Sequence, residues 1–348
     1  MFRTIKIDNY RGIRTTEIKE LSQVNLFFGK NNCGKSSVLE AILLVSGQSN
    51  PILPLNVNGF RGFSNFSEQD LALDFYNLVE GKICISVEDN VPRSLEITTF
   101  HSHDNDVSLS EMGASGSQIP MASYGLRLNY KLGNNSYSSN LLVTKKDGDK
   151  NNGRVNIDKR YKESLYAEYL PSSFMQISVV EKYAQVVADK QEEQIVRILR
   201  AIEPRIKDMQ LVGNNLLVDV GLERRLPINV MGDGVRKLVS IILSIYRCRN
   251  GILLIDEIDN GFHYSVMSQM WKAVFMSAAL NNTQVFITTH NIESMKEMIS
   301  MLKHDENSSY RNMLSAYKLI KDNTDKVSGV KYQYEQMGYS IEQEMEIR

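Results

Sequence analysis

The stretch GKNNCGKSS, residues 29–37, constrains the fold of this chain more than any other. Gly29 is followed by four residues and then by Gly34, Lys35 and Ser36, which is the spacing of a loop that holds phosphate. The apolar run VNLFF precedes the loop, and SSVLEAILLVS, with apolar residues at helical spacing, follows it. Because a phosphate loop requires a strand before it and a helix after it, we expect an α/β fold with this site.

The composition favours a folded protein in a reducing compartment. With 348 residues and 42% hydrophobic content, the chain can build one large domain or two ordinary ones. Lys+Arg 40 against Asp+Glu 41 gives a formal net charge of -1, so contact with nucleic acid or an anionic membrane would need a local patch. Cys33, Cys84 and Cys248 are too few and too scattered for a disulfide framework. Lacking a signal-like start or a run of ~18 apolar residues, the sequence predicts a cytoplasmic protein without membrane contact.

Two later apolar runs end in residues suited to the same site. In GILLIDEID the run leads into Asp256 and Glu257, and QVFITTH ends in His290. Ligands of parallel sheets bind at the carboxyl ends of the strands. We therefore expect Ser36 and Asp256 to hold Mg²⁺, Glu257 to polarise the attacking water and His290 to contact the γ-phosphate. The structural alternatives are a solvated acidic strand end and a capping histidine.

A second glycine-containing loop predicts an oligomer. MGDG, residues 231–234, precedes a helix of apolar period 3.6, so it forms another helix N-terminus suited to an anion. The first loop already serves the phosphates of its own protomer. A second anion site therefore makes sense if it reads the nucleotide of a neighbouring molecule, which predicts a dimer.

The remaining segments divide the chain. Short alternating runs separated by polar turns predict a β-rich lobe, and a helical pattern follows it before strand alternation returns. We expect four parts: the N-terminal part of the fold in 1–80, the β-rich lobe in 81–172, a helical segment and strand in 173–226, and the C-terminal part in 227–348.

With these elements together, the chain resembles an ABC-type ATPase head of the group that includes RecF, the SMC proteins and the overcoming-lysogenization-defect (OLD) family. The small OLD-like ATPases of the AAA_15 and AAA_21 groups are the most similar. The stretches that carry the resemblance are IKIDNYRGI, GKNNCGKSS, LPINVMGDGVRKL, LLIDEIDNGFHYSVMSQMW, VFITTH and EMEIR.

The resemblance implies named roles along the chain. Asp256 and Glu257 would form the Walker B pair, Asp259 the D-loop residue at a dimer seam, and His290 the switch histidine. The Walker A loop would bind ATP through Gly29, Asn31, Asn32, Cys33, Gly34, Lys35, Ser36 and Ser37.

The signature segment departs from the family pattern. Residues 231–235 stand where ABC proteins carry Leu-Ser-Gly-Gly-Gln, and Gly232 replaces the serine. The contact with the partner's ATP would then come from the backbone of Gly232, Asp233 and Gly234, or from Arg236 or Lys237.

Weaker signals have two interpretations each. Gln69 could be a Q-loop ligand of Mg²⁺ or a surface glutamine, and HSHDND, residues 101–106, a metal site or a solvated loop. Basic residues in 145–162, together with Arg197, Arg200, Arg205 and Lys207, could contact a phosphate backbone or belong to a solvated face.

The resemblance also implies a function. The short segment after His290 contains no Asp-x-Asp, so we expect no Toprim nuclease domain in this chain. The leading hypothesis is a slow, Mg²⁺-dependent ATPase that closes a head-to-head homodimer on ATP, or a higher oligomer. It would act as the sensor or regulatory subunit of an anti-phage system with a separately encoded effector, a Toprim-like nuclease or a toxin. The alternatives are a RecF-like DNA repair or maintenance ATPase and a nucleotide-gated scaffold with almost no turnover.

Overall fold

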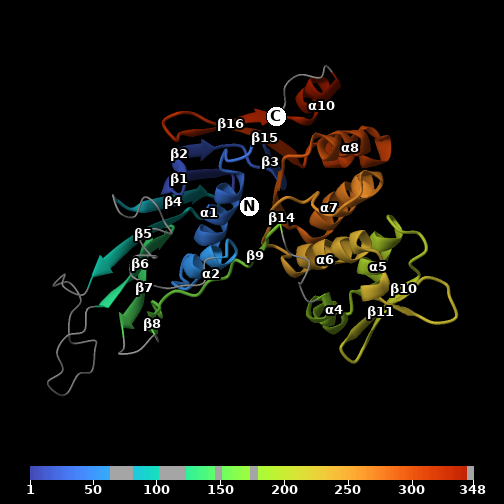
Figure 1. Ribbon diagram of the computed structural model, residues 1–348, viewed down its shortest axis with the longest axis horizontal. Coiled ribbons are helices and arrows are strands. Elements are labelled where there is room, and N and C mark those ends of the chain that lie inside the picture. Colours follow the sequence, from blue (N-terminus) through green and yellow to red (C-terminus); the bar gives the residue numbers. More distant parts are fainter. Residues whose placement is uncertain (63–80, 102–122, 146–150, 173–178, 343–348) are drawn as a thin grey trace.

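The computed structural model describes residues 1–62, 81–101, 123–145, 151–172 and 179–342. Within these residues two large β-sheets run side by side, with helices between them and on one outer side (Figure 1).

The first sheet is antiparallel, in the order β2-β1-β4-β5-β6-β7-β8. The N-terminal hairpin of β1 and β2 pairs directly with the strands expected in the β-rich lobe, since β1 aligns Ile5 with Val87 of β4. The expected boundary after residue 80 therefore falls inside one sheet. The strands are β1 (Thr4–Tyr10), β2 (Ile13–Ile18), β4 (Ile83–Glu88), β5 (Arg93–His101), β6 (Ser123–Leu132), β7 (Asn135–Lys145) and β8 (Asn151–Asn156).

The second sheet carries the sequence motifs. Its order is β16-β15-β3-β14-β13-β9, and all neighbours are parallel except the pair β15 and β16. The carboxyl ends of β3, β14 and β13 therefore lie next to one another. The strands are β3 (Val24–Phe28), β9 (Ala167–Leu170), β13 (Ile252–Ile255), β14 (Gln284–Thr289), β15 (Leu314–Lys321) and β16 (Val327–Tyr332).

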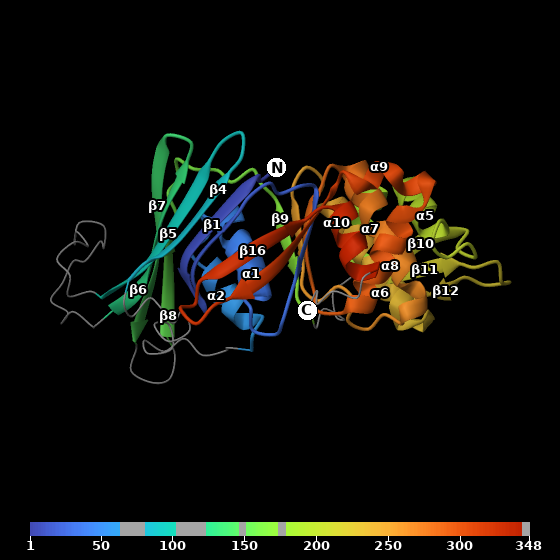
Figure 2. The same cartoon turned by 90° about the horizontal axis from the view of Figure 1, so that it is seen from above.

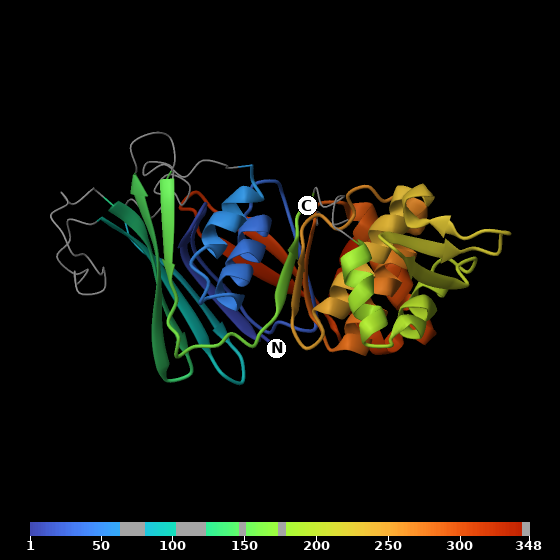
Figure 3. The same ribbon diagram turned by 90° about the horizontal axis from the view of Figure 1, so that it is seen from below.

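Helices cover the second sheet on both faces, as Figures 2 and 3 show from above and below. Helices α1 (Lys35–Ser46) and α2 (Leu53–Gly59) lie between the two sheets. The opposite face of the second sheet carries α4 (Val179–Ala188), α5 (Glu192–Arg200), α6 (Asp233–Arg247), α7 (Met267–Asn281) and α8 (Ile292–Lys303). The shorter elements are β10 (Asp208–Val212), β11 (Asn215–Asp219), β12 (Leu226–Pro227), α9 (Ser308–Arg311), α10 (Tyr334–Glu342), and the 3₁₀ turns η3 (Ile228–Val230), η4 (Tyr264–Val266) and η5 (Asp305–Asn307).

The second sheet separates two apolar cores, because successive side chains of a strand point to opposite faces. In β13, Ile252 and Leu254 enter the core shared with α1 and the antiparallel sheet, which we call the inner core. Leu253 and Ile255 enter the core shared with α4 to α8, which we call the outer core. Strands buried on both faces are the reason that these segments read as continuous apolar runs in the sequence.

Most of the expected elements are present, with two corrections. The helical segment expected within 173–226 forms two helices, α4 and α5, because the chain turns at Lys190, whose φ of 57° is left-handed. Strand β2 was not predicted at all.

Candidate functional site

The phosphate loop, residues 29–37, joins β3 to α1. Lys35 is buried, and its Nζ donates to the carbonyl oxygens of Gly29 at 2.9 Å and Lys30 at 2.8 Å. Helix α1 has no acidic residue in its first turn, and no side chain caps its N-terminus at Gly34. The partial positive charge of this helix end is therefore available to an anion.

The loop has the backbone that its glycines permit. Gly29 and Gly34 have φ of 140° and 97°, and Asn32 has φ of 62°. Both glycines are also tightly enclosed, because a Cβ on Gly29 would lie 2.6 Å from the carbonyl oxygen of Leu319. The side chains of the predicted ligands Asn31 and Asn32 are exposed, whereas Cys33 and Ser37 are buried.

Asp256 is the residue at which the expected elements meet. Its Oδ1 accepts from Ser36 Oγ at 3.1 Å and from Thr288 Oγ1 at 2.5 Å, and its Oδ2 accepts from Tyr169 OH at 3.1 Å. The donors come from α1, β14 and β9. The structure thus brings Ser36 and Asp256 together, as predicted, and adds Thr288 and Tyr169, which the sequence reasoning missed.

This donor set fits a divalent cation. Asp256 is buried, with 8% of its surface exposed, and in the part of the chain that the structure describes no cationic group lies within ion-pair distance of it. A buried carboxylate bound only by hydroxyl groups lacks a counter-charge. Carboxylate and hydroxyl oxygens are ligands that Mg²⁺ accepts.

Glu257 lies at the open side of the same site. Its φ of 49° is left-handed, and its N–H donates to Thr288 Oγ1 at 2.8 Å. The carboxylate lies 3.6 Å from His290 Nδ1 and accepts from Asn260 Nδ2 at 3.3 Å. Both Glu257 and His290 are partly exposed, so the pair can reach a bound molecule.

Asp259 is held by the end of β14. It is buried and accepts from Thr289 Oγ1 at 2.5 Å, and Thr289 in turn accepts from the N–H of Asn291. Thr288 and Thr289 therefore fix the three acidic residues that follow β13. In the sequence, the only indication of Thr288 and Thr289 is the polar end of the run QVFITTH.

The signature loop, residues 231–235, belongs to the opposite face of the sheet. Helix α6, which it precedes, packs in the outer core, whereas α1 packs in the inner core. Gly232 and Asp233 are exposed, Gly234 is half-buried, and Asp233 pairs with Arg236 at 2.9 Å. A Cβ at Gly232 would meet no atom within 4 Å.

Lys237 contacts its own chain. Its Nζ donates to the carbonyl oxygen of Asn260 and lies 5.1 Å from the ring centre of Phe262. Burial lowers the pKa of Lys237 to about 8, although the negative charges of Asp259 and Glu257 act to raise it. This side chain therefore ties α6 to the IDNG segment, residues 258–261.

A network centred on the buried carboxylate of Glu40 supports the phosphate loop. Glu40 of α1 pairs with Arg11 Nε at 2.6 Å and with Arg61 Nε at 2.7 Å. Arg61 also donates to Ser37 Oγ at 3.4 Å, and Tyr10 OH donates to Glu40. No sequence motif indicates these contacts, because they join segments that are distant in sequence.

Some of the weaker predictions concern residues outside the described ones, and others concern side chains that contact their own chain. Gln69 and residues 102–106 lie outside them, and the rest of the described chain shows no metal-ligand cluster. Arg200 donates to the carbonyl oxygens of Ile206 and Lys207, and Arg205 pairs with Glu203. These contacts match the structural interpretation of the basic residues at the end of α5.

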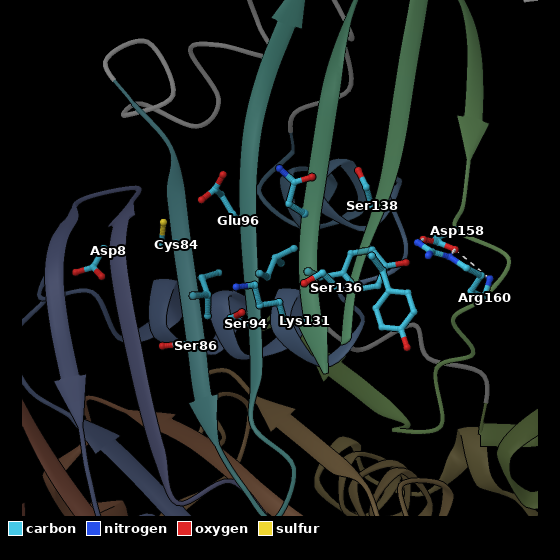
Figure 4. Close-up of a pocket in the computed structure, with 15 residues that line it drawn as sticks. Asp8, Cys84, Ser86, Ser94, Glu96, Lys131, Ser136, Ser138, Asp158 and Arg160 are labelled. Carbon is cyan, nitrogen blue, oxygen red and sulfur yellow. Dashed lines mark hydrogen bonds and ion pairs between the residues drawn. The ribbon is translucent and has the colours of Figure 1, made fainter. Parts of the chain in front are cut away.

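A polar hollow of about 620 Å³ lies on the antiparallel sheet, on the face away from α1 (Figure 4). Its walls are alternate residues of the strands, such as Cys84 and Ser86 of β4. Asp8, Glu96 and the pair of Asp158 with Arg160 at 2.6 Å all have ion-pair partners. None of the lining residues belongs to the phosphate loop.

The comparisons with known proteins agree with this geometry. A family profile described as "AAA domain, putative AbiEii toxin, Type IV TA system" matches residues 24–296, which is most of the chain. The chain belongs to this AAA-domain family. The matched residues of this AAA-domain protein run from the start of β3 into α8 and so include the phosphate loop, the signature loop and Asp256.

Relatives and solved structures extend the comparison. A Helicobacter pylori protein named ATP/GTP phosphatase is 25% identical over 88% of this chain and 90% of its own. The Smc head in a crystal structure with the C-winged helix domain of ScpA has a TM-score of 0.52 and 12% identity, over 95% of this chain and 97% of that one. The SMC head domain from Thermotoga maritima has a TM-score of 0.47 and 12% identity, over 95% of this chain and 99% of that one.

The predicted fold class is thereby confirmed. This AAA-domain protein has the P-loop α/β fold of an Smc head domain. Within the described residues, no helix is both long and apolar enough to span a membrane.

Proposed function

We propose that this AAA-domain protein is an ATPase, which binds ATP and Mg²⁺ at the phosphate loop and hydrolyses the nucleotide with Glu257 as general base. The observation that carries the proposal is the meeting of Ser36, Asp256 and Thr288 beside Glu257. Lys35 and the N–H groups at the start of α1 would hold the β- and γ-phosphates. Ser36 and Asp256 would hold Mg²⁺, which when bound offsets the negative charge that builds up on the phosphates.

In this proposal Glu257 activates the attacking water. Its carboxylate is partly exposed, and its backbone is held by Thr288, so it can accept a proton from water without moving its strand. His290, 3.6 Å away, would contact the γ-phosphate and orient this carboxylate. The name of the Helicobacter pylori relative, ATP/GTP phosphatase, supports nucleotide hydrolysis as the reaction.

We further propose a homodimer in which each signature loop reads the partner's nucleotide. Since α6 and α1 lie on opposite faces of the sheet, a second copy would bring its Gly232, Asp233 and Gly234 to the phosphate loop of the first. Two exposed apolar side chains would be covered by such an association: Val230, next to the signature loop, and Tyr264, which follows the IDNG segment, at 65% exposure each. Asp259 would then lie at the seam.

The role we propose is that of a sensor or regulatory subunit that controls a separately encoded effector. The family description, which names a putative toxin and a type IV toxin–antitoxin system, supports a two-component arrangement. The Smc head of similar fold was crystallised with a domain of another protein, which supports a head that binds a partner. Slow hydrolysis would reset the ATP-bound dimer.

Glu257→Gln tests the proposed reaction. We expect this variant to bind ATP as the wild type does, to lose hydrolysis by about 10²–10⁴-fold, and to accumulate as a dimer in light scattering. Glu293→Gln, at an exposed position of α8, is the matched control and keeps its turnover. Normal turnover by Glu257→Gln would refute the assignment of the base.

The same variant identifies the partner. Tagged Glu257→Gln protein is recovered from its native cells with ATP present, with and without nuclease, and its companions are identified by mass spectrometry. A stoichiometric protein that survives nuclease supports the regulatory role. Recovery of DNA without such a protein refutes that role in favour of a DNA repair function.

A further inference from the structure

Tyr169 of β9 contacts the expected metal ligand from a strand that carries no recognised motif. Its OH donates to Asp256 Oδ2 at 3.1 Å, while the two other hydroxyl donors, Ser36 and Thr288, bind Oδ1. Strand β9 pairs in parallel with β13, and Asp256 N–H also donates to Leu170. Both the backbone and the side chain of Asp256 are thus fixed by β9.

The tyrosine is itself held in place. It is buried, with 9% of its surface exposed, and the ring of Phe60 stacks on it with centroids 5.0 Å apart and an interplanar angle of 27°. The hydroxyl of Tyr169 is therefore held against Asp256 by ring packing as well as by its own hydrogen bond.

We propose that Tyr169 is a positioning residue for Mg²⁺: its hydroxyl occupies Oδ2 and turns Oδ1 of Asp256 toward Ser36. The inference rests on the proposed function, in which Ser36 and Asp256 hold the cation. A ligating carboxylate that is fixed by an outer hydrogen bond binds its metal more tightly, typically by 10–100-fold. Phe60, which directly follows α2, supports the tyrosine and so links α2 to the proposed metal site.

Tyr169→Phe tests this role because it removes one hydroxyl and keeps the ring that stacks on Phe60. The binding of a fluorescent ATP analogue is measured in EDTA and over a Mg²⁺ titration, without reference to turnover. We expect unchanged affinity in EDTA and a Mg²⁺ requirement raised about tenfold. Phe60→Ala, which leaves every hydrogen bond of Asp256 in place, should raise the requirement by a smaller factor.

Tyr161→Phe is the matched control. Tyr161 is also a buried tyrosine whose OH donates to a carboxylate, Glu163 at 2.6 Å, and its other partner is Gln48. This variant loses a similar hydrogen bond, so it reports any general effect on stability, and its Mg²⁺ requirement should stay that of the wild type.

The outcomes separate the two proposals. A wild-type Mg²⁺ requirement in both Tyr169→Phe and Phe60→Ala would overturn the positioning role while leaving ATP binding intact. If the affinity of the wild-type protein for the analogue does not depend on Mg²⁺, the proposed metal site is wrong, and the positioning role with it. If Tyr169→Phe does not fold, as judged by circular dichroism, the result for Phe60→Ala decides the inference.

Discussion

Gly34 and Gly232 are both loop glycines before a helix, yet their surroundings impose opposite constraints. Gly34 has φ of 97°, and a Cβ there would lie 3.3 Å from Ile13 Cγ1. Gly232 has φ of -54°, which any residue adopts, and open space where its Cβ would be. The first position requires glycine, and the second only tolerates it.

Substitution at these two glycines should therefore differ in cost. We expect Gly34→Ala to lower the free energy of unfolding by about 1–3 kcal/mol, because alanine is strained in the left-handed region. Gly232→Ser should stay within about 0.5 kcal/mol of the wild type. Urea unfolding without nucleotide measures both, and equal losses would contradict the geometry of the two loops.

Lys237 gives the stability a pH dependence. Burial lowers its pKa from 10.5 to about 8, so between these values the unfolded chain keeps a proton that the folded chain has released. Stability should therefore rise with pH through this window, by up to about 1 kcal/mol per pH unit. Below pH 8 the charged ammonium is buried at a cost.

Lys237→Met measures this contribution, because it removes the titrating group and keeps an apolar stem over Phe262. The difference in unfolding free energy between the wild type and the variant should grow in favour of the wild type from pH 8 to pH 9.5. A constant difference would show that Lys237 keeps an ordinary pKa.

At the scale of elements, the sequence predicted those whose pattern is local. The phosphate loop and the apolar run before Asp256 lie where their residues suggested, because each needs only its own strand and turn. The hydrogen bonds from Tyr169 to Asp256 and from Thr289 to Asp259 could not be predicted. They form because β9 and β14 are the two neighbours of β13 in the sheet. The pairing of β1 with β4 was hidden for the same reason.

Helix α4 is fixed to the sheet by a buried ion pair. Lys182 Nζ lies 2.5 Å from Glu168 Oε1 of β9 and 2.5 Å from Ser244 Oγ of α6. Lys182 is almost fully buried and Glu168 largely so, and burial lowers the pKa of the lysine. The pair thus joins three elements of the outer core.

Lys182→Met should destabilise the fold by about 3–5 kcal/mol, because it leaves the carboxylate of Glu168 buried without a counter-charge. Replacing both residues by apolar ones should recover part of this loss. Lys296→Met, which breaks an exposed pair with Glu293, should cost at most about 1 kcal/mol. Chemical unfolding compares them, and similar losses for the buried and exposed pairs would argue against the linkage.

At the scale of the whole molecule, the second sheet makes its two cores interdependent. Phe27 faces the inner core while Leu26 and Phe28 of the same strand face the outer one. If such a strand loses its packing on one face, it also loses the position that its side chains on the other face need for their packing. We expect both cores to unfold in one transition.

Ile42→Ala tests this coupling, with the single tryptophan as reporter. Ile42 lies in the inner core, and Trp271 is buried in the outer core with its Nε1 bonded to the carbonyl oxygen of Ser294. The variant should lose about 2–5 kcal/mol, and Trp271 fluorescence should report the same midpoint as circular dichroism. Ile320→Ala, exposed on β15, is the control. If Ile42→Ala leaves the midpoint of the Trp271 fluorescence transition unchanged, the two cores unfold independently.

The order of strands in the second sheet also has a consequence for synthesis. Strand β3 precedes the phosphate loop near the start of the chain, yet both of its hydrogen-bonding edges are filled by β14 and β15 from the last part. A nascent chain leaving the ribosome therefore carries the apolar run VNLFF without its neighbours until β14 and β15 have also been made. The proposed nucleotide site can form only after that point, and until then the run is a surface for chaperones or for aggregation.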